Sequence, residues 1–206
     1  MRCVIIGGAD INNYDAIRSY LKNDDFNIFC DCGLKHLKAL KINADLIVGD
    51  FDSHKKPETS TETIVLPREK DDTDTFFAIK EAIRRNFDDF ILIGVIGNRL
   101  DHTLVNVSIL NYLDSIGKSG KIIDDYSEME IINCSTSATV DDCFPYFSLI
   151  NMFGISEGVT IKNAKFPLEN AVITPEFQYA TSNEVIKGKK AEITVRTGKL
   201  LLIKNR

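Results

Sequence analysis

The chain has 206 residues, a formal net charge of −5 and an apolar fraction of 44%. These values are those of an ordinary soluble protein with room for one large domain or two modest ones. The acidic balance argues against a nucleic-acid-binding scaffold, because phosphate backbones are bound by basic surfaces. It permits a nucleotide that binds through a metal ion, which brings its own positive charge.

The N-terminal residues and the cysteines indicate the cellular location of the protein. No apolar stretch approaches the roughly 20 residues that cross a bilayer, so we expect no membrane partner. Residues 1–8 have the pattern of a buried first strand and no signal-peptide cleavage pattern. The five cysteines form no C-x-x-C pair, and Cys3 and Cys30 lie in apolar runs, where reduced cysteine is a small hydrophobic residue. We therefore expect a reducing, cytoplasmic location.

The first part of the chain alternates short apolar runs with stretches of helical periodicity. The predicted strands lie at residues 4–6, 27–30, 46–48, 63–66, 90–93 and 121–123, and the predicted helices at 14–22, 34–40, 76–83 and 104–110. Strands that alternate with helices indicate a mostly parallel sheet with helices on both faces. We predict an α/β catalytic domain over residues 1–127.

The helical period disappears after about Glu128. Short strands are predicted at residues 129–132, 138–140, 146–150, 159–161, 171–173, 191–195 and 200–203. Turn residues are expected between them, including Glu157-Gly158 and Thr197-Gly198-Lys199. The pattern predicts an all-β second domain over residues 128–206, either a sandwich or a barrel.

Carboxylates follow several of the predicted strands of the first domain. In an open parallel sheet, ligands bind beyond the carboxyl ends of the strands, so acids in these connections share one edge. Such a density of oxygen ligands suits a hard cation such as Mg²⁺, with phosphate oxygens beyond it. The acids in these connections are Asp31, Asp50, Asp52, Asp71, Asp74 and Asp101.

Simpler interpretations of the acids stay open at this point. An isolated D-x-D pair, here Asp50 and Asp52, is more often a solvated turn than a metal site. Asp72 or Thr73 could cap the helix that follows. Three further acidic pairs lack this context and are expected to be solvated, namely Asp24-Asp25, Asp88-Asp89 and Asp141-Asp142.

The segment Gly94-Val95-Ile96-Gly97-Asn98-Arg99 adds a possible phosphate partner. Glycines allow a backbone to approach a ligand closely, and the planar guanidinium of Arg99 offers several donors to phosphate oxygens. His102 shares this loop with Arg99 and Asp101. Alone, this signal is weak.

Taken in order, five motifs resemble those of the thiamin pyrophosphokinase family. The family pattern runs through an acidic-glycine turn, G-D-x-D-S, K-D-x-T-D, G-x-x-G-x-R-x-D-H and a T/S-S-N-E segment. In this chain the motifs are Asp31-Cys32-Gly33, Gly49-Asp50-Phe51-Asp52-Ser53, Lys70-Asp71-Asp72-Thr73-Asp74, Gly94 through His102, and Thr181-Ser182-Asn183-Glu184. They span nearly the whole chain. Cys32 and Asn98 stand where the family usually has glycine.

The resemblance implies transfer of the pyrophosphoryl group of ATP to the hydroxyl of thiamin, with Mg²⁺ required. It also implies an α/β domain followed by a β-sandwich, a homodimer, and a thiamin site between subunits. The implied catalytic residues are Asp50, Asp52, Asp71, Asp74 and Asp101, and all of these except Asp74 are implied metal ligands. The implied nucleotide-binding residues are Asp31, Gly33, Ser53, Arg99 and His102, and the implied substrate-binding residues are Thr73, Asp74, Phe166, Ser182 and Asn183.

Two other functions, and another role for Phe166, compete with this interpretation. A haloacid-dehalogenase-like phosphatase shares the D-x-D spacing, but it wants Thr or Val two residues after the second Asp, where this chain has His54. A noncatalytic nucleotide- or thiamin-binding module has less need for so many acids. Phe166, in Lys165-Phe166-Pro167-Leu168, either stacks on thiamin, as an aromatic does in the family, or is a core residue under a turn.

Overall fold

The structure is a computed structural model that describes residues 1–51, 58–69 and 71–206. It divides into two compact units, Met1–Asp125 and Tyr126–Arg206. Each unit contains a hydrophobic core cluster of its own. Among the described residues, no helix has the length and apolar character needed to cross a membrane.

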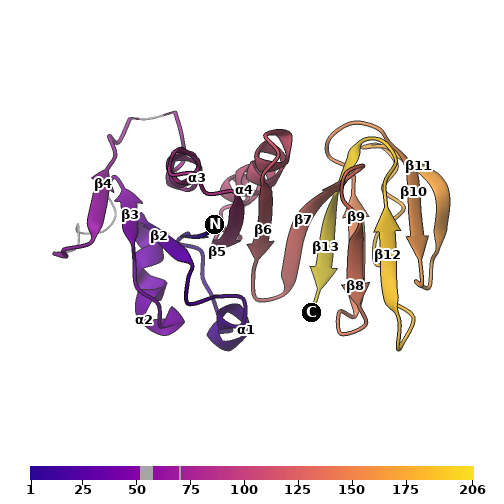
Figure 1. Ribbon diagram of the computed structural model, residues 1–206, viewed down its shortest axis with the longest axis horizontal. Coiled ribbons are helices and arrows are strands. Elements are labelled where there is room, and N and C mark those ends of the chain that lie inside the picture. Colours follow the sequence, from indigo (N-terminus) through magenta and orange to yellow (C-terminus); the bar gives the residue numbers. More distant parts are fainter. Residues whose placement is uncertain (52–57, 70) are drawn as a thin grey trace. The chain divides into compact units, whose positions relative to one another are not determined.

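The first unit is built on a parallel sheet (Figure 1). Its strands are β1 (Arg2–Ile6), β2 (Phe26–Cys30), β3 (Leu46–Gly49), β4 (Glu62–Val65), β5 (Asp89–Ile93) and β6 (Ser119–Ile123). They lie in the order β4-β3-β2-β1-β5-β6, and every neighbouring pair is parallel. The predicted parallel sheet is confirmed, and its carboxyl ends share one edge.

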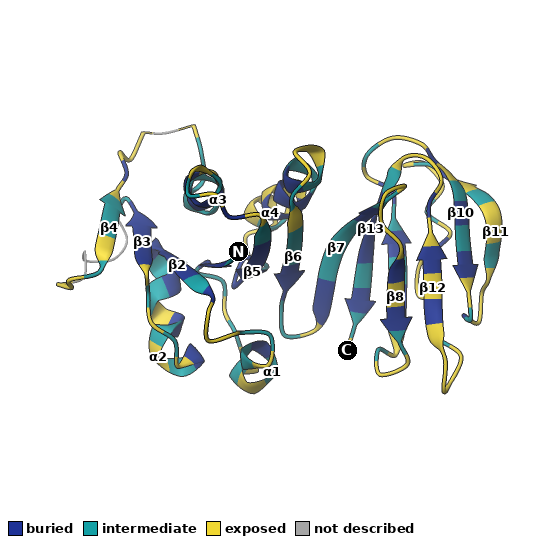
Figure 2. Ribbon diagram, in the orientation of Figure 1, coloured by how far each residue is buried: buried dark blue, intermediate teal, exposed yellow. Residues whose placement is uncertain are grey.

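Helices cover both faces of this sheet, as predicted. They are α1 (Tyr14–Arg18), the 3₁₀ helix η1 (Asp31–His36), α2 (Leu37–Leu40), α3 (Asp74–Arg84) and α4 (Leu100–Ser115). Figure 1 shows α1 and α2 on one face and α3 and α4 on the other. Val4 and Ile6 of β1 share a core cluster with Ile17 of α1 and Leu40 of α2. Because side chains alternate along a strand, the residues between them face the other helices. The strands β1, β2, β3 and β5 are mostly buried, as the colouring of β3 in Figure 2 illustrates.

Two helices differ from the sequence prediction. The helix predicted over residues 14–22 ends at Arg18, where Tyr20 N bonds to Ile17 O and the backbone tightens into three-residue turns. The helix predicted over residues 34–40 begins earlier, at Asp31, and its first part is a 3₁₀ helix.

The second unit is a β-sandwich. Its strands are β7 (Ser127–Asn133), β8 (Ala138–Asp141), β9 (Tyr146–Ile150), β10 (Ser156–Lys162), β11 (Leu168–Ile173), β12 (Lys190–Thr194) and β13 (Lys199–Asn205). One antiparallel layer has the order β7-β13-β9 and the other β11-β10-β12-β8. Phe147, Leu149 and Leu202 of the first layer form one core with Val159 and Ile193 of the second. The sandwich is confirmed in preference to a barrel.

Gly158 does not separate two strands, so that part of the sequence prediction was wrong. It lies inside β10, where the pairing with β11 shifts register between Glu157 and Val159. Its φ is +66°, and a Cβ there would lie 2.5 Å from the Cβ of Arg196. Glycine is therefore required at this β-bulge both by the positive φ and by the close approach of the Arg196 side chain.

Asp25 was also predicted wrongly, since it is not a solvated turn residue. It is only 8% exposed. Arg2 donates from Nε to Asp25 Oδ1 at 2.7 Å and from Nη2 to Oδ2 at 2.6 Å. This two-pronged ion pair ties the start of β1 to the turn that precedes β2.

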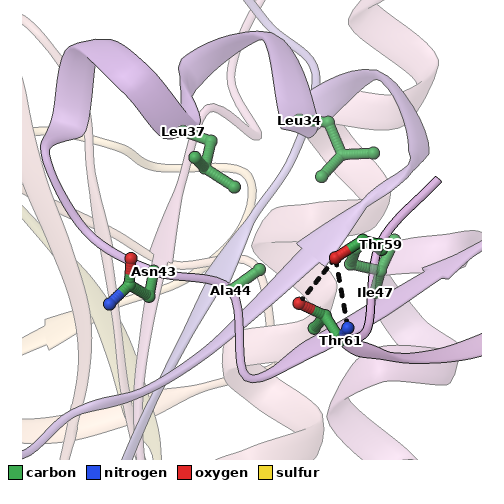
Figure 3. A pocket seen from close by; sticks show the side chains of 7 residues that line it. All are labelled: Leu34, Leu37, Asn43, Ala44, Ile47, Thr59 and Thr61. Atoms are coloured by element: carbon green, nitrogen blue, oxygen red, sulfur yellow. Dashed lines mark hydrogen bonds between the residues drawn. The ribbon is translucent and has the colours of Figure 1, made fainter. Parts of the chain in front are cut away.

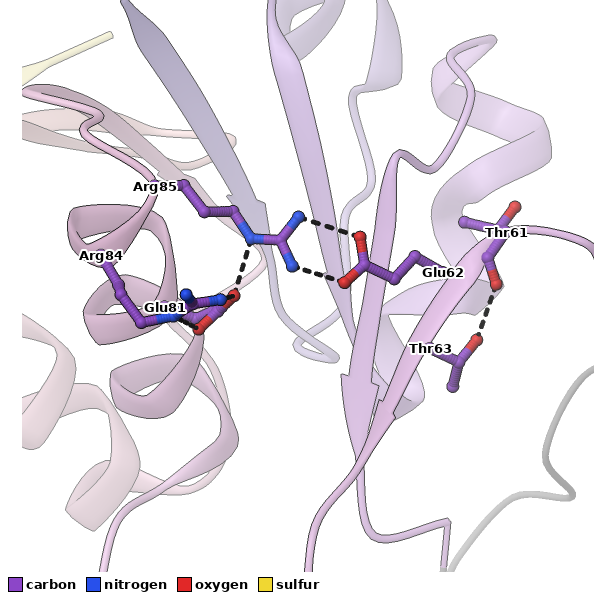
Figure 4. A network of polar contacts seen from close by, with 6 residues as sticks. All are labelled: Thr61, Glu62, Thr63, Glu81, Arg84 and Arg85. Atoms are coloured by element: carbon purple, nitrogen blue, oxygen red, sulfur yellow. Dashed lines mark hydrogen bonds and ion pairs between the residues drawn. The ribbon is translucent and has the colours of Figure 1, made fainter.

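A second polar network joins α3 to the edge strand β4 (Figure 4). Arg85 donates to Glu81 at 2.7 Å and, with both terminal nitrogens, to Glu62 of β4. Arg84 donates to the same Glu81 at 2.7 and 2.8 Å. Hydrogen bonds from Arg84, and then from Arg85, hold the pKa of Glu81 at about 2, below its ordinary 4.5.

We expect the Glu81→Gln variant to be less stable than the wild type by about 1.5–3 kcal/mol at neutral pH, because it loses charge-assisted hydrogen bonds. A lowered folded-state pKa adds stability above the unfolded-state pKa and loses it as the pH falls through the folded-state value. The difference between the two proteins should therefore shrink as the pH falls from about 4.5 to about 2. Urea unfolding across this pH range measures it, and a constant difference would contradict the pairing.

Candidate active site

Three carboxylates meet at the carboxyl edge of the parallel sheet. Asp31 follows β2, Asp50 follows β3, and Asp74 is the first residue of α3. One carboxylate oxygen from each lies within 4.8 Å of the other two. The arrangement follows from the topology, because β2 and β3 are parallel neighbours and residues that follow them emerge side by side.

The backbone around these acids is strained in a way that brings them together. Asp31 has a φ of +27° and Phe51, beside Asp50, a φ of +54°, values that residues with a side chain rarely adopt. A Cβ on Gly49 would lie 2.9 Å from the Cβ of Asp31. The glycine of the G-D-x-D segment therefore lets Asp31 approach the end of β3. Strain of this kind is typical of functional sites.

The electrostatics of the three acids suit a divalent cation. Asp31 is 8% exposed, and its Oδ1 has no hydrogen-bond partner within the described residues. Like unit charges at this separation repel by about 3–4 kcal/mol per pair at an effective dielectric constant of about 20. Two oxygens on opposite sides of a Mg²⁺ ion lie about 4.2 Å apart, given bonds of about 2.1 Å. The donor set and its spacing therefore fit a hard cation bound to oxygen.

Cys32, one of the two departures from the family pattern, contacts this group. Its Sγ donates a hydrogen bond to Asp31 Oδ2 at 3.3 Å. Burial, followed by this hydrogen bond, raises the pKa of Cys32 to about 11. The residue is therefore a neutral thiol near pH 7, and it adds no negative charge to the three acids.

The K-D-x-T-D segment places its other members differently. Asp71 is exposed and lies outside the cluster formed by the described acids. Asp72 forms an ion pair with Lys80. Thr73 is the N-cap of α3, and its Oγ1 accepts from Phe76 N at 3.2 Å. Of the two candidate caps, Thr73 is therefore correct. Asp52 and Ser53 lie outside the described residues.

Arg99, Asp101 and His102 lie at the start of α4, on the exposed surface of the first unit. Arg99 donates to Asp101 from Nε at 3.2 Å and from Nη2 at 2.6 Å. The guanidinium lowers the pKa of Asp101 to about 2. Among the described acids, Asp101 is not part of the carboxylate cluster. Gly33, the remaining predicted nucleotide-binding residue of this unit, is buried within η1.

In the second unit, Asn183 and Phe166 form one hydrogen-bonded group. Asn183 is 2% exposed. Its Oδ1 accepts from Phe166 N at 3.1 Å, and its Nδ2 donates to Phe166 O at 2.8 Å. Phe166 is 56% exposed, so the core interpretation of this residue was wrong. Asn183 holds the backbone that presents an aromatic ring at the surface.

Charged and polar neighbours complete this surface. Lys165 pairs with Glu184 at 2.8 Å, and its Nζ lies 5.6 Å from the centre of the Phe166 ring. A cation therefore already occupies one face of the ring. Ser182 is exposed, with a φ of +53°, and its backbone N donates to Ser148 Oγ at 3.0 Å.

A cavity of about 310 Å³ lies elsewhere in the first unit (Figure 3). Leu34 and Leu37 line one side of it, and Ile47, Thr59 and Thr61 line the other. Thr59 and Thr61 bond to each other at 3.1 Å, so their hydroxyl groups are already engaged. None of the three clustered acids lines this cavity, and we assign it no part in the chemistry.

The cluster differs from the metal-ligand set that the family resemblance implies. Asp31, an implied nucleotide-binding residue, and Asp74, an implied catalytic and substrate-binding residue, each contribute an oxygen to the cluster with Asp50, whereas Asp71 and Asp101 do not. The position of Asp31 directly after a strand was the available signal. The roles of the other predicted site residues stay predictions.

Comparisons with known proteins give the family. Residues 17–122 match the thiamin pyrophosphokinase catalytic domain, and residues 131–200 match the thiamin pyrophosphokinase vitamin B1 binding domain. The chain belongs to the thiamin pyrophosphokinase family. A thiamine pyrophosphokinase of Bacillus subtilis is 25% identical over 208 residues, which cover 98% of this chain and 97% of the relative.

Solved structures of this family have the same fold. The crystal structure of thiamine pyrophosphokinase from Bacillus subtilis matches with a TM-score of 0.88 at 22% identity, covering 100% of this chain and 99% of that one. Thiamin pyrophosphokinase from Geobacillus thermodenitrificans matches with a TM-score of 0.84 at 25% identity, covering 100% and 98%. Thiamin pyrophosphokinase from Candida albicans matches with a TM-score of 0.80 at 14% identity, and the match covers 99% of this chain and 88% of that one.

The carboxylate cluster predicts direct binding of a divalent cation. We expect Asp31→Asn to weaken Mn²⁺ binding at least about tenfold, because a buried charged oxygen is replaced by a neutral amide. Electron paramagnetic resonance titration of Mn²⁺ without nucleotide measures this. Asp88→Asn is the control, since Asp88 pairs with the N-terminal ammonium at 2.7 Å, away from the cluster. Equal Mn²⁺ affinities for the two variants would show that Asp31 is no ligand.

Proposed function

We propose that this enzyme transfers the pyrophosphoryl group of ATP to the hydroxyl of thiamin, which gives thiamin diphosphate and AMP. The observation that carries the proposal is the cluster of Asp31, Asp50 and Asp74 in a chain whose two units match the catalytic and vitamin B1 binding domains of this family. Phosphoryl-type transfer needs little covalent chemistry, so positioning and charge neutralisation account for most of the catalysis.

The acids at the sheet edge would hold Mg²⁺. Asp50 is the predicted ligand that the cluster contains, and Asp31 and Asp74 supply the other two clustered oxygens. The ion, when bound, would neutralise the charge of the phosphates and of the acids around it. We retain Asp52, Asp71 and Asp101 as predicted ligands or positioning groups around this centre.

The loop that leads into α4 would bind the phosphates of ATP. Arg99 is 69% exposed, so its guanidinium can reach a ligand from the surface, and His102 lies one helical turn further along. Asp101, with a pKa of about 2, is a weak general base near neutral pH while it is bound to Arg99. Its proposed role is therefore to orient Arg99. Asp31, Gly33 and Ser53 are the other proposed nucleotide-binding residues.

The second unit would bind thiamin, which is a cationic heteroaromatic. The exposed ring of Phe166 provides a stacking face, and Asn183 fixes the backbone behind it. Thiamin would replace the Lys165 ammonium on that face. Ser182, Thr73 and Asp74 are the other proposed substrate contacts. We also propose a cytoplasmic homodimer with the thiamin site between subunits, as the family resemblance implies.

The rival functions lack a supporting observation. The family match extends over both units of the chain. It therefore favours neither a haloacid-dehalogenase-like phosphatase nor a noncatalytic binding module. No second function is proposed.

The first test is the identity of the nucleotide product. We expect conversion of ATP to AMP only when thiamin and a divalent cation are both present, because one transfer step moves two phosphates together. Chromatography of the nucleotides after incubation measures it, with reactions that omit thiamin or the metal as controls. Accumulation of ADP or of free phosphate would contradict the proposal.

The second test concerns Phe166. We expect Phe166→Ala to weaken thiamin binding by about 0.5–2 kcal/mol, the range for a cation over an aromatic face. Because Phe166 is 56% exposed, the melting temperature should hardly change. Calorimetric titration with thiamin and a thermal melt measure the two effects. Phe177→Ala, which removes another exposed ring of the same unit, is the control and should bind thiamin normally.

A further inference from the structure

Helix α3 runs from the carboxylate cluster, at the carboxyl ends of the strands, to the side of the sheet where the strands begin. Asp74 is its first residue, and Arg85 follows its last. At about 1.5 Å per residue the two lie about 16 Å apart along the axis, and a tilt of about 4° over that length moves an end by about 1 Å. The placement of Asp74 therefore depends on what fixes the far end of the helix.

Apolar packing holds the two ends of α3 unequally. Near its start, the Phe76 ring packs edge-on against Tyr112 of α4, with the ring centres 5.1 Å apart, and Ile79 in the next turn is fully buried. In the last turn the buried residues are Ala82 and the charged Glu81. Hydrophobic stabilisation scales with the apolar area removed from water, and an alanine side chain offers little of it. Polar contacts therefore matter most at the C-terminal end of the helix.

Arg85 supplies those contacts (Figure 4). Its Nη1 donates to Glu62 Oε2 at 2.9 Å, its Nη2 to Glu62 Oε1 at 2.5 Å, and its Nε to Glu81 Oε1 at 2.7 Å. The guanidinium also lies 5.9 Å from the ring centre of Phe26 in β2. With a side chain only 22% exposed, Arg85 links α3 to two strands of the sheet.

The strand that Arg85 holds leads back to the cluster. Glu62 is the first residue of β4, an edge strand paired only with β3 in the described sheet. The pairing ends at Gly49↔Val65, and Leu66 N donates to Gly49 O at 2.9 Å. Asp50 is the next residue after Gly49. Asp74 and Asp50 are thus connected through α3, Arg85, Glu62 and the β4–β3 pair.

We propose that Arg85 is a positioning residue for the metal site: by bridging Glu81 and Glu62 it sets the position of Asp74 relative to Asp50, and thereby the affinity of the carboxylate cluster for a divalent cation. The inference rests on the metal-binding role given to the cluster under the proposed function. Arg85 itself touches neither metal nor substrate. Loss of a partner that hydrogen-bonds a metal ligand directly typically costs roughly 10–100-fold in metal affinity or activity, and for a bridge that acts through a helix we expect the lower end of that range.

Arg84 provides a matched control on the same helix. It donates to Glu81 at 2.7 and 2.8 Å, as Arg85 does, but its side chain is 72% exposed. Within the described residues it has no hydrogen bond to β4. The two arginines therefore share one partner and differ in the link to the sheet.

The test compares Arg85→Met with Arg84→Met by Mn²⁺ titration under electron paramagnetic resonance, without ATP or thiamin and well below the melting temperature of either protein. We expect Mn²⁺ to bind about tenfold more weakly to Arg85→Met, and within about twofold of the wild type to Arg84→Met. Glu62→Ala should reproduce the loss, and the double variant Glu62→Ala/Arg85→Met should lose no more than either single variant, because both break one link. In turnover assays, excess metal should restore part of the rate of Arg85→Met.

Each other outcome overturns the inference. Equal Mn²⁺ affinities of the two arginine variants would show that Arg85 only stabilises the fold, and independent losses for Glu62 and Arg85 would show that the bridge is not what matters. If Arg85→Met does not fold, Glu62→Ala decides alone, since Glu62 is 55% exposed on an edge strand. If the wild-type protein binds no Mn²⁺, both the metal-binding role of the cluster and this inference are overturned. If the wild type binds Mn²⁺ and the variants bind it with the same affinity, only this inference is overturned.

Discussion

Mutual repulsion of three carboxylates at one edge of a parallel sheet is the constraint around which the first unit is arranged. Oxygens of Asp31, Asp50 and Asp74 lie within 4.8 Å of one another. Like charges at that distance separate unless the chain holds them or a cation neutralises them. The unit holds them with two positive-φ residues and with a glycine that allows β3 to approach Asp31. Local strain of this size persists only where the surrounding structure determines it.

The surrounding structure supplies that support from strands that are apolar on both faces. β1, β2 and β5 are almost fully buried, because helices cover the sheet on both sides. Such a sheet is rigid, so residues that follow its strands are fixed in position. Helix α3 packs on this sheet, and its last turn buries only Ala82 and the charged Glu81. The ion pairs of Arg85 hold that end of the helix to β4, and Asp74 lies at the other end.

The element types could be read from the sequence, whereas the membership of the cluster could not. Apolar runs and helical periods depend on local sequence, and they predicted each strand found among the described residues of both units. Which acids meet depends on strand order. In the order β4-β3-β2-β1-β5, the strands before Asp31 and Asp74 both neighbour β3, whereas the strand before Asp101 lies three places from β3, or about 14 Å away at about 4.8 Å per strand. Asp101 is therefore outside the cluster although its motif belongs to the same edge.

Long-range partners explain the other errors. Asp25 resembled a solvated turn residue because its partner, Arg2, is distant in sequence and arrives only when β1 and β2 pair. Gly158 resembled a turn because a bulge and a turn both need a positive φ. In each case the residue type indicated the local backbone geometry but did not indicate which distant segment packs against the residue.

Asn183 shows how a motif residue can act through a neighbour. A side-chain amide is both donor and acceptor, so one asparagine can bond the N–H and the C=O of a single distant residue. Asn183 does this to Phe166, and being 2% exposed it has little surface left for a ligand. Neither an ionised aspartate, which only accepts, nor leucine, which does neither, could make both bonds. The T-S-N-E segment and Phe166 are therefore one structural unit, in which the asparagine determines where the aromatic ring stands.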